Sequence, residues 1–170
     1  AGMPRGLKET SGMITIGFKT QETVAGTMNQ TRIDLQLNVL DREVFVVYGV
    51  NLDLSPPEAI AGVNTSTFGS VSTTNRTTVG NLSQSNVIAT AGNQIESDPT
   101  FGVGFAYSSA DAPATQLEYL GIIATNDFFA QVIGGNNLGT QTMTGRLYGV
   151  RAQASADIFA ALTQSELLSA

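Results

Sequence analysis

The residues in this chain whose types could carry out chemistry are carboxylates near the ends of predicted strands. Two pairs can be compared with the paired acids that cleave glycosidic bonds, Asp53 with Glu58 and Glu118 with Asp127. Their spacing is also typical of solvated surface acids, and the chain offers no third group beside them. We therefore expect all four side chains to lie on the surface, and we expect the protein not to be an enzyme.

Oxygen ligands suited to calcium occur at Asn126, Asp127 and Asp111, but their spacing matches no recognisable calcium-binding loop. The chain contains no His and no Cys, which removes the commonest general base, the thiolate ligands and any disulfide. The run Gly102-Val103-Gly104 lacks the third glycine and the following helix of a dinucleotide-binding loop. The sequence thus predicts no catalytic residue, no metal site and no cofactor.

Four Asn-x-Ser/Thr sequences could accept N-linked glycans, and they begin at Asn29, Asn64, Asn75 and Asn81. A chain this rich in Asn, Ser and Thr contains such sequences through composition alone, so we do not interpret them as glycosylation sites. The tyrosines fall mostly on strand positions that predict a place in the core: Tyr48, Tyr107, Tyr119 and Tyr148. A sugar-stacking platform is not expected, because such platforms usually use Trp and the chain has none.

The composition describes one globular domain with a polar but weakly charged surface. A chain of 170 residues can bury one core and is short for two domains. Hydrophobic residues make up 42% and charged residues 13%, so Thr, Ser, Asn, Gln and Gly supply most of the polar surface. A net charge of −6 argues against a general nucleic-acid binder, since phosphates are neutralised by clustered Lys and Arg. No apolar run reaches the roughly eighteen residues of a membrane-spanning helix.

Two long strand-like runs between Arg32 and Leu54 form the strongest structural signal. Ile33, Leu35, Leu37 and Val39 alternate with polar residues, which is typical of a strand with one buried face. A second run extends from Glu43 to Leu54, and its uninterrupted apolar start predicts burial on both faces. Because only a short turn at Asp41 and Arg42 separates the runs, we expect them to pair as a central hairpin.

The remaining segments predict further strands and two short helices. Ser55 to Gly62 has a cap residue, prolines in the first turn and a terminal glycine, so we expect a short helix at Pro56–Ala61. Helical spacing of Ile158, Ala161 and Leu162 predicts a C-terminal helix. Its apolar side chains Ile158, Leu162, Leu167 and Leu168 can cover the protein's own sheet, which we favour, or reach into a partner. Strands are expected at 13–18, 86–90, 101–107, 117–125, 128–133 and 141–154, with an exposed strand pair and long loops at 63–86. The predicted domains are an N-terminal arm at 1–11, which orders only on assembly, a β-sandwich at 12–154 and a helical extension at 155–170.

Eight or nine strands with few helices indicate an all-β sandwich or barrel. As a whole the pattern resembles the small viral capsid proteins of the single jelly-roll type, through the weakly basic arm at 1–11, the antiparallel strands with polar loops, the helix at Pro56–Ala61 and the extension through Ala170. The resemblance implies an antiparallel jelly-roll β-sandwich of two four-stranded sheets. It also implies a virion capsid subunit that self-assembles into a homo-oligomeric shell with itself and other virion proteins. The arm is less basic than in capsid proteins that bind genome, which leaves room for a membrane or a protein layer beneath the shell.

A second class fits the same polar surface. A secreted or cell-surface β-sandwich adhesin, including pilus-type subunits joined by strand addition, would be extracellular rather than part of a virion. An enzyme on a jelly-roll scaffold is disfavoured, because cupin-type sites rely on the His ligands that this chain lacks.

The alternation around Leu37 gives a first prediction. We expect Leu37→Asp to prevent folding, because an unpaired buried charge costs several kcal/mol against a total stability of about 5–15 kcal/mol. Circular dichroism and thermal melting of the variant test this expectation. A native-like spectrum with a cooperative melt would show that position 37 faces solvent.

Overall fold

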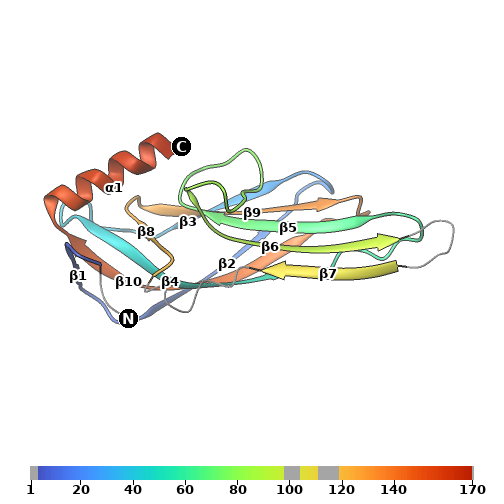
Figure 1. Cartoon of the computed structure of the whole chain (residues 1–170), viewed down its shortest axis with the longest axis horizontal. Coiled ribbons are helices and arrows are strands. Elements are labelled where there is room, and N and C mark those ends of the chain that lie inside the picture. Colours follow the sequence, from blue (N-terminus) through green and yellow to red (C-terminus); the bar gives the residue numbers. More distant parts are fainter. Residues whose placement is uncertain (1–3, 98–103, 111–118, 170) are drawn as a thin grey trace.

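The computed structural model describes residues 4–97, 104–110 and 119–169, with the backbone alone described at 104–110 and 166–169. These residues form two five-stranded antiparallel sheets (Figure 1). In sheet A, β1 (Leu7–Glu9) and β2 (Ile14–Gln21) share one edge of β10 (Thr142–Ala154), which is followed by β4 (Glu43–Leu54) and β8 (Gly121–Ile123). Sheet B runs in the order β3 (Asn29–Asp34), β9 (Asp127–Gly135), β5 (Thr65–Ser72), β6 (Val87–Ser97) and β7 (Gly104–Ala110). Helix α1 (Ala156–Ser169) follows β10, so the predicted antiparallel β-sandwich with a C-terminal helix is confirmed.

The strand pairs are nested along the chain. The innermost pair is β5 with β6, and outside it lie β4 with β8, β3 with β9 and β2 with β10. Two further pairs, β4 with β10 and β5 with β9, join these into the two sheets. The first long strand therefore lies beside the last one, and most connections cross from one sheet to the other.

The main core fills the space between the sheets. It consists of buried apolar side chains from both layers, chiefly Phe45, Val47, Val71, Ile123, Phe128, Ala130, Val132, Met143 and Leu147. Phe18 of β2 meets Phe128 of β9 edge to face, with ring centroids 5.5 Å apart and planes at 81°. Each fully buried large side chain contributes about 1.5–3 kcal/mol, so this layer dominates the stability.

Strand β4 is buried on both faces in its first half, as its apolar run predicted. The inner-face residues Phe45 and Val47 belong to the main core, whereas the outer-face residues Val44 and Val46 belong to a second cluster. A β-bulge then reverses this alternation, because Tyr148 pairs with Gly49 while Gly149 pairs with Val47, which leaves Tyr48 as an extra residue. The residues that turn inward after the bulge are Val50, Leu52 and Leu54.

The expected central hairpin is wrong, because its two strands belong to different sheets. The first strand ends at Asp34 and pairs with β9 in sheet B, whereas β4 pairs with β10 and β8 in sheet A. Residues 35–42 cross between the sheets, although Leu35 and Leu37 stay buried and keep the alternation of a strand. Gln36 and Arg42 adopt positive φ values of 54° and 53°, which turn the chain away from an extended path.

Arg151 holds this crossing segment against the end of sheet A. Its guanidinium donates to the carbonyl of Leu35 at 2.7 Å and to the Glu43 carboxylate at 3.0 Å. The Leu35 N–H in turn donates to the carbonyl of Asn126 at 2.7 Å. The buried backbone groups of the crossing are thus paired without a hairpin.

The expected helix at Pro56–Ala61 is also wrong, because residues 55–60 are irregular and a turn follows at 61–62. The Glu58 N–H donates to the Asn137 side chain at 2.8 Å, and the Glu58 carbonyl accepts from the Thr65 hydroxyl at 2.6 Å. Both backbone groups that a helical turn would use therefore bind side chains from other segments. The prolines and cap residue of Ser55–Gly62 fit this extended path as well as they fit a helix.

The N-terminal segment differs from the loose arm that the sequence predicted. Residues 7–9 form strand β1, which pairs with residues 152–154 of β10. Leu7 packs against the outer cluster, and the Thr10 N–H donates to the carbonyl of Arg151 at 2.9 Å. From Leu7 onward the segment is thus part of the sandwich edge, and it continues directly into β2.

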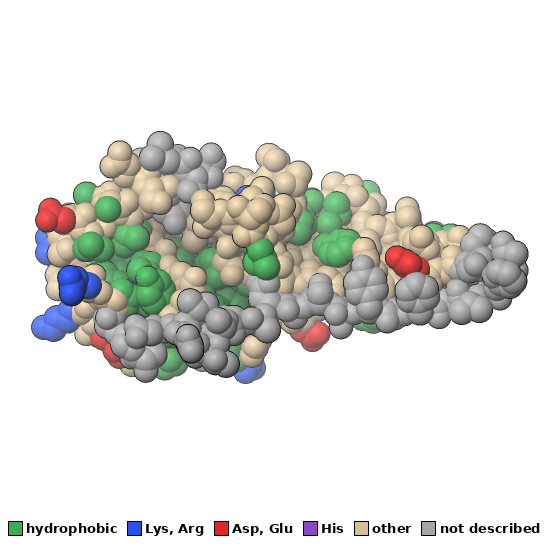
Figure 2. All heavy atoms as spheres, in the orientation of Figure 1, with side chains coloured by type: hydrophobic (Ala, Val, Ile, Leu, Met, Phe, Trp, Pro, Cys, Tyr) green, Lys and Arg blue, Asp and Glu red, His purple; other side chains and the backbone are tan. Residues whose placement is uncertain are grey.

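Helix α1 covers part of the outer face of sheet A at the end where β10 finishes (Figure 1). Ile158, Phe159 and Leu162 pack against the outer cluster of Val44, Val46, Ala124, Val150, Ala152 and Ala154. Figure 2 shows apolar side chains gathered at this end of the molecule. The prediction that the helix covers its own sheet is confirmed for Ile158 and Leu162, and Phe159 packs on the same cluster, while the side chains of Leu167 and Leu168 lie outside the described set.

Two glycines allow a test of how tightly β10 fits the core. A Cβ at Gly149 would lie 2.3 Å from the carbonyl oxygen of Val46 and 2.4 Å from the Phe45 ring, so we expect Gly149→Ala to lower the free energy of unfolding by about 1–3 kcal/mol. Gly17 of β2 has no atom within 4 Å of such a Cβ, so Gly17→Ala should be neutral or stabilising. Urea denaturation of both variants measures the difference. Equal midpoints for the two would contradict the close approach of β4 to β10.

Candidate functional site

The turn between β9 and β10 is held by carboxylates from two other segments. The Glu22 side chain, which is 3% exposed, accepts hydrogen bonds from the N–H groups of Gly134 at 3.1 Å and Gln141 at 2.8 Å. The Glu58 carboxylate accepts a further bond from the Gly139 N–H at 2.8 Å. Charge-assisted bonds of this type are stronger than neutral ones, so they hold the backbone of the turn on both sides.

Two buried amides complete this arrangement. Asn137 donates to the carbonyl of Ser66 at 2.8 Å, and Gln141 accepts from the hydroxyl of Ser55 at 2.7 Å. Among these inward-facing polar groups, Leu138 points to solvent and is 83% exposed. The fold thus presents one large apolar side chain on this anchored turn. We call residues 136–140, with Leu138 at their centre, the Leu138 tip.

Large apolar side chains are exposed at both ends of the sandwich. At the end where β10 begins, Leu138 is accompanied by Val24 in the connection from β2 to β3. At the end where β10 finishes, Val39 and Leu40 are exposed in the crossing from β3 to β4, with Leu40 at 93%. The thirteen residues of β10 separate these ends by roughly 40 Å, at about 3.3 Å per residue.

A loop at 73–86 is attached to the outer face of sheet B by buried polar side chains. Gln131 of β9 is fully buried, accepts from the Ser70 hydroxyl at 2.6 Å and donates to Gln30 at 2.7 Å. The loop joins this network where the Gly80 N–H donates to Ser70 at 2.9 Å and the Arg76 N–H donates to Gln30 at 2.9 Å. The expected exposed strand pair at 63–86 is therefore wrong, since β5 is an inner strand of sheet B and the loop packs upon it.

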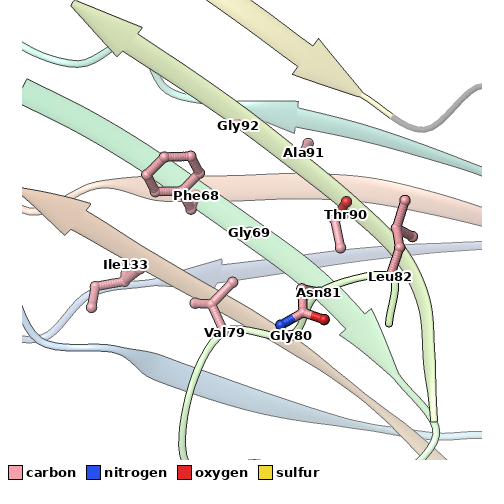
Figure 3. A pocket seen from close by; sticks show the side chains of 10 residues that line it. All are labelled: Phe68, Gly69, Val79, Gly80, Asn81, Leu82, Thr90, Ala91, Gly92 and Ile133. Atoms are coloured by element: carbon pink, nitrogen blue, oxygen red, sulfur yellow. The ribbon is translucent and has the colours of Figure 1, made fainter. Parts of the chain in front are cut away.

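Beside this loop lies an apolar groove of about 540 Å³ on the outer face of sheet B, which we call the sheet-B groove (Figure 3). Phe68 of β5 and Ile133 of β9 lie on the sheet side, while Val79 and Leu82 come from the loop. Its remaining lining residues are small or neutral: Gly69, Gly80, Asn81, Thr90, Ala91 and Gly92. Among the described residues no charged side chain lines the groove, and its volume is in the range of small-molecule and side-chain binding sites.

A second, polar depression of about 440 Å³ lies on the outer face of sheet A. It is lined by Asn51 and Asp53 of β4 and by Thr144, Arg146 and Tyr148 of β10, together with Leu52 and Gly145. Asn51 donates to the Tyr148 hydroxyl at 3.2 Å. The expected core position is therefore wrong for Tyr148, whereas Tyr48 and Tyr119 pack against the outer cluster and the side chain of Tyr107 lies outside the described set.

The described carboxylates of the predicted acid pairs and calcium set have different surroundings. Asp53 is exposed in the depression on sheet A, whereas Glu58 binds the Leu138 tip. Asp127 forms an ion pair with Arg32 at 2.5 Å, which raises the pKa of the Arg32 guanidinium, first through the hydrogen bond and then through the charge of Asp127. Glu118 and Asp111, the other members of the predicted acid and calcium sets, lie outside the described residues.

The side chains of the four sequon asparagines all make hydrogen bonds, two of them to residues more than thirty positions away. Asn29 donates to the carbonyl of Gln21 at 2.7 Å, and Asn75 accepts from Gln30 at 3.0 Å. Asn64 accepts from the Ser97 N–H at 2.9 Å, and Asn81 accepts from the Ser83 N–H at 3.0 Å. These bonds fix turns and loop ends, and glycosylation of the four sites remains untested.

Among residues 4–97, 104–110 and 119–169, no three Asp or Glu side chains come close enough to hold a metal ion. No helix in the same ranges has the length and apolar character needed to cross a bilayer.

Sequence reasoning missed the groove, the buried Glu22 and the Leu138 tip. Glu22 stands in a polar stretch between strands, and its partners are more than one hundred residues away in the chain. Leu138 did carry a signal, since it is a single large apolar residue within the turn-forming run Gly134–Gly139.

Neither the models of protein families nor the curated protein sequences with which the chain was compared match it.

The buried carboxylate gives a testable consequence. We expect Glu22→Ala to lower the free energy of unfolding by about 2–4 kcal/mol, because each buried N–H that loses its acceptor costs about 1–3 kcal/mol. Glu58→Ala serves as a matched control, since it frees one N–H on an exposed glycine, and it should cost below about 1.5 kcal/mol. Chemical denaturation of both variants measures the two values. A smaller effect for Glu22→Ala than for Glu58→Ala would show that Glu22 does not hold the turn.

Proposed function

We propose that this protein is a structural subunit, a virion capsid protein that self-assembles into a homo-oligomeric shell. The observation that carries the proposal is the exposure of large apolar side chains at both ends of the sandwich. Val24 and Leu138 at one end and Val39 and Leu40 at the other remain uncovered in the single chain. Each of these side chains would gain free energy if another protein surface removed it from water.

The positions of these side chains favour assembly in which one surface of a subunit contacts a different surface of the next subunit. Groups at opposite ends of one molecule cannot meet within it, but they can meet complementary surfaces on neighbouring copies. Contacts between unlike surfaces generate a closed ring or shell when the repeated rotation from copy to copy returns to the first copy. An elongated subunit with contact groups at both ends suits such an arrangement.

The strand order supports a jelly roll, the finer form of the sandwich. Nested pairs from β5–β6 outward to β2–β10 are what a long antiparallel ribbon gives when it folds over on itself. Jelly rolls of eight strands occur in viral capsid and lectin domains. In this interpretation β1 and β7 are additions at the edges of the two sheets.

A surface adhesin is the second candidate, and the polar depression on sheet A favours it. Asp53, Arg146 and Tyr148 place an acid, a guanidinium and an aromatic ring in one shallow site, a combination that can bind hydroxyl-rich ligands. Recovery of the protein from purified particles would support the capsid role, and recovery from cell-surface filaments would support the adhesin.

Assembly can be tested directly on the purified chain. We expect light scattering after size-exclusion chromatography to show a mass that rises with concentration, and electron microscopy to show closed particles at high concentration. The Leu40→Ser variant should melt like the original protein, because the side chain is 93% exposed, and should assemble less. A strict monomer at every concentration would count against the capsid proposal.

A further inference from the structure

We propose that the Leu138 tip of one subunit inserts into the sheet-B groove of a second copy of the chain. This inference rests on the proposed self-assembly and names the surfaces that would make one of its contacts. The two surfaces are separate within one molecule, because Leu138 is 83% exposed and is not among the residues that line the groove. A contact between them must therefore form between copies.

The first argument is the rigidity of the tip. Three charge-assisted bonds, from Gly134 and Gln141 to Glu22 and from Gly139 to Glu58, fix the backbone on both sides of Leu138. A side chain on a fixed turn loses little conformational entropy when it binds. A flexible turn could fold its leucine back onto the surface, whereas this turn keeps it in solvent.

The second argument is the match in polarity between the tip and the groove. The groove is lined by Phe68, Val79, Leu82 and Ile133, with small and neutral residues between them, so it offers an apolar surface without charge. The tip, Asn136 to Thr140, likewise contains no charged residue. The carboxylate beside the tip, Glu58, already accepts a hydrogen bond from the Gly139 N–H, and no residue of the tip itself brings a charge to the groove.

The competing tip at Leu40 fits the groove less well. Leu40 is flanked by Asp41, Arg42 and Glu43, and insertion would bring these charged groups to an uncharged wall. We therefore assign the groove to Leu138, and Leu40 to a different contact. Since one leucine in one groove buries far less than the area of a stable dimer, the contact is weak alone and gains strength by repetition in a shell.

The experiment uses substitutions at both surfaces. Leu138→Asp should remain folded with an unchanged melting temperature, and it should weaken self-association roughly tenfold or more, since it removes a buried leucine and introduces a charge. Leu138→Met keeps an apolar side chain of similar size and should associate like the original protein. Leu82→Asp at the mouth of the groove should weaken association to a similar degree, with Leu82→Met as its control.

A mixing experiment then tests whether the two surfaces meet each other. A fluorescently labelled Leu138→Asp subunit retains its groove, and an unlabelled Leu82→Asp subunit retains its tip. Sedimentation velocity of the mixture should show labelled complexes, although each variant alone associates poorly. Labelled protein that stays monomeric in the mixture, or Leu138→Asp that self-associates like the original chain, would overturn the inference. Failure of the original protein to associate at all would instead overturn the proposed function.

Discussion

The structure depends on one long strand that is paired along both edges. β10 pairs with β1 and β2 along one edge and with β4 along the other, so the first two strands are connected to β4 only through it. Two positions on the inner face of β10 leave no room for a side chain: Gly145 lies against the Phe18 ring, and Gly149 lies against Phe45 and the backbone of β4. Larger residues there would separate the strands that the rest of the sandwich is built upon.

The individual strands could be predicted from the sequence better than their partners. Glu43–Leu54 was predicted to the residue because its apolar run is long and its ends are polar, and its burial on both faces followed from the same run. Pairing of 33–39 with this strand was wrong because Leu35 and Leu37 keep the period of a strand while the chain crosses between sheets. Residues 1–11 were predicted as a loose arm because the partner of residues 7–9, the end of β10, is more than one hundred residues away in the sequence.

The polar interactions that shape the candidate surface were harder to predict for a related reason. A single Glu or Gln in a polar stretch has the sequence signature of a solvated residue, and only the fold brings Glu22 to Gly134 or Gln131 to Ser70. Such groups are buried because each donor and acceptor finds a partner, which no local pattern records. The apolar groove arises in the same way, from a loop that polar bonds attach to the face of sheet B.

The nested strand order also determines when each part of the sandwich can form. The strands β5 and β6 are neighbours in the sequence and can pair early, whereas β1 and β2 pair with β10, which follows them by more than one hundred residues. Closing such long loops is slow, because their entropy is lost before the contacts form. During synthesis the apolar face of β2 therefore stays uncovered until β10 has left the ribosome, and premature encounters between nascent copies compete with correct folding.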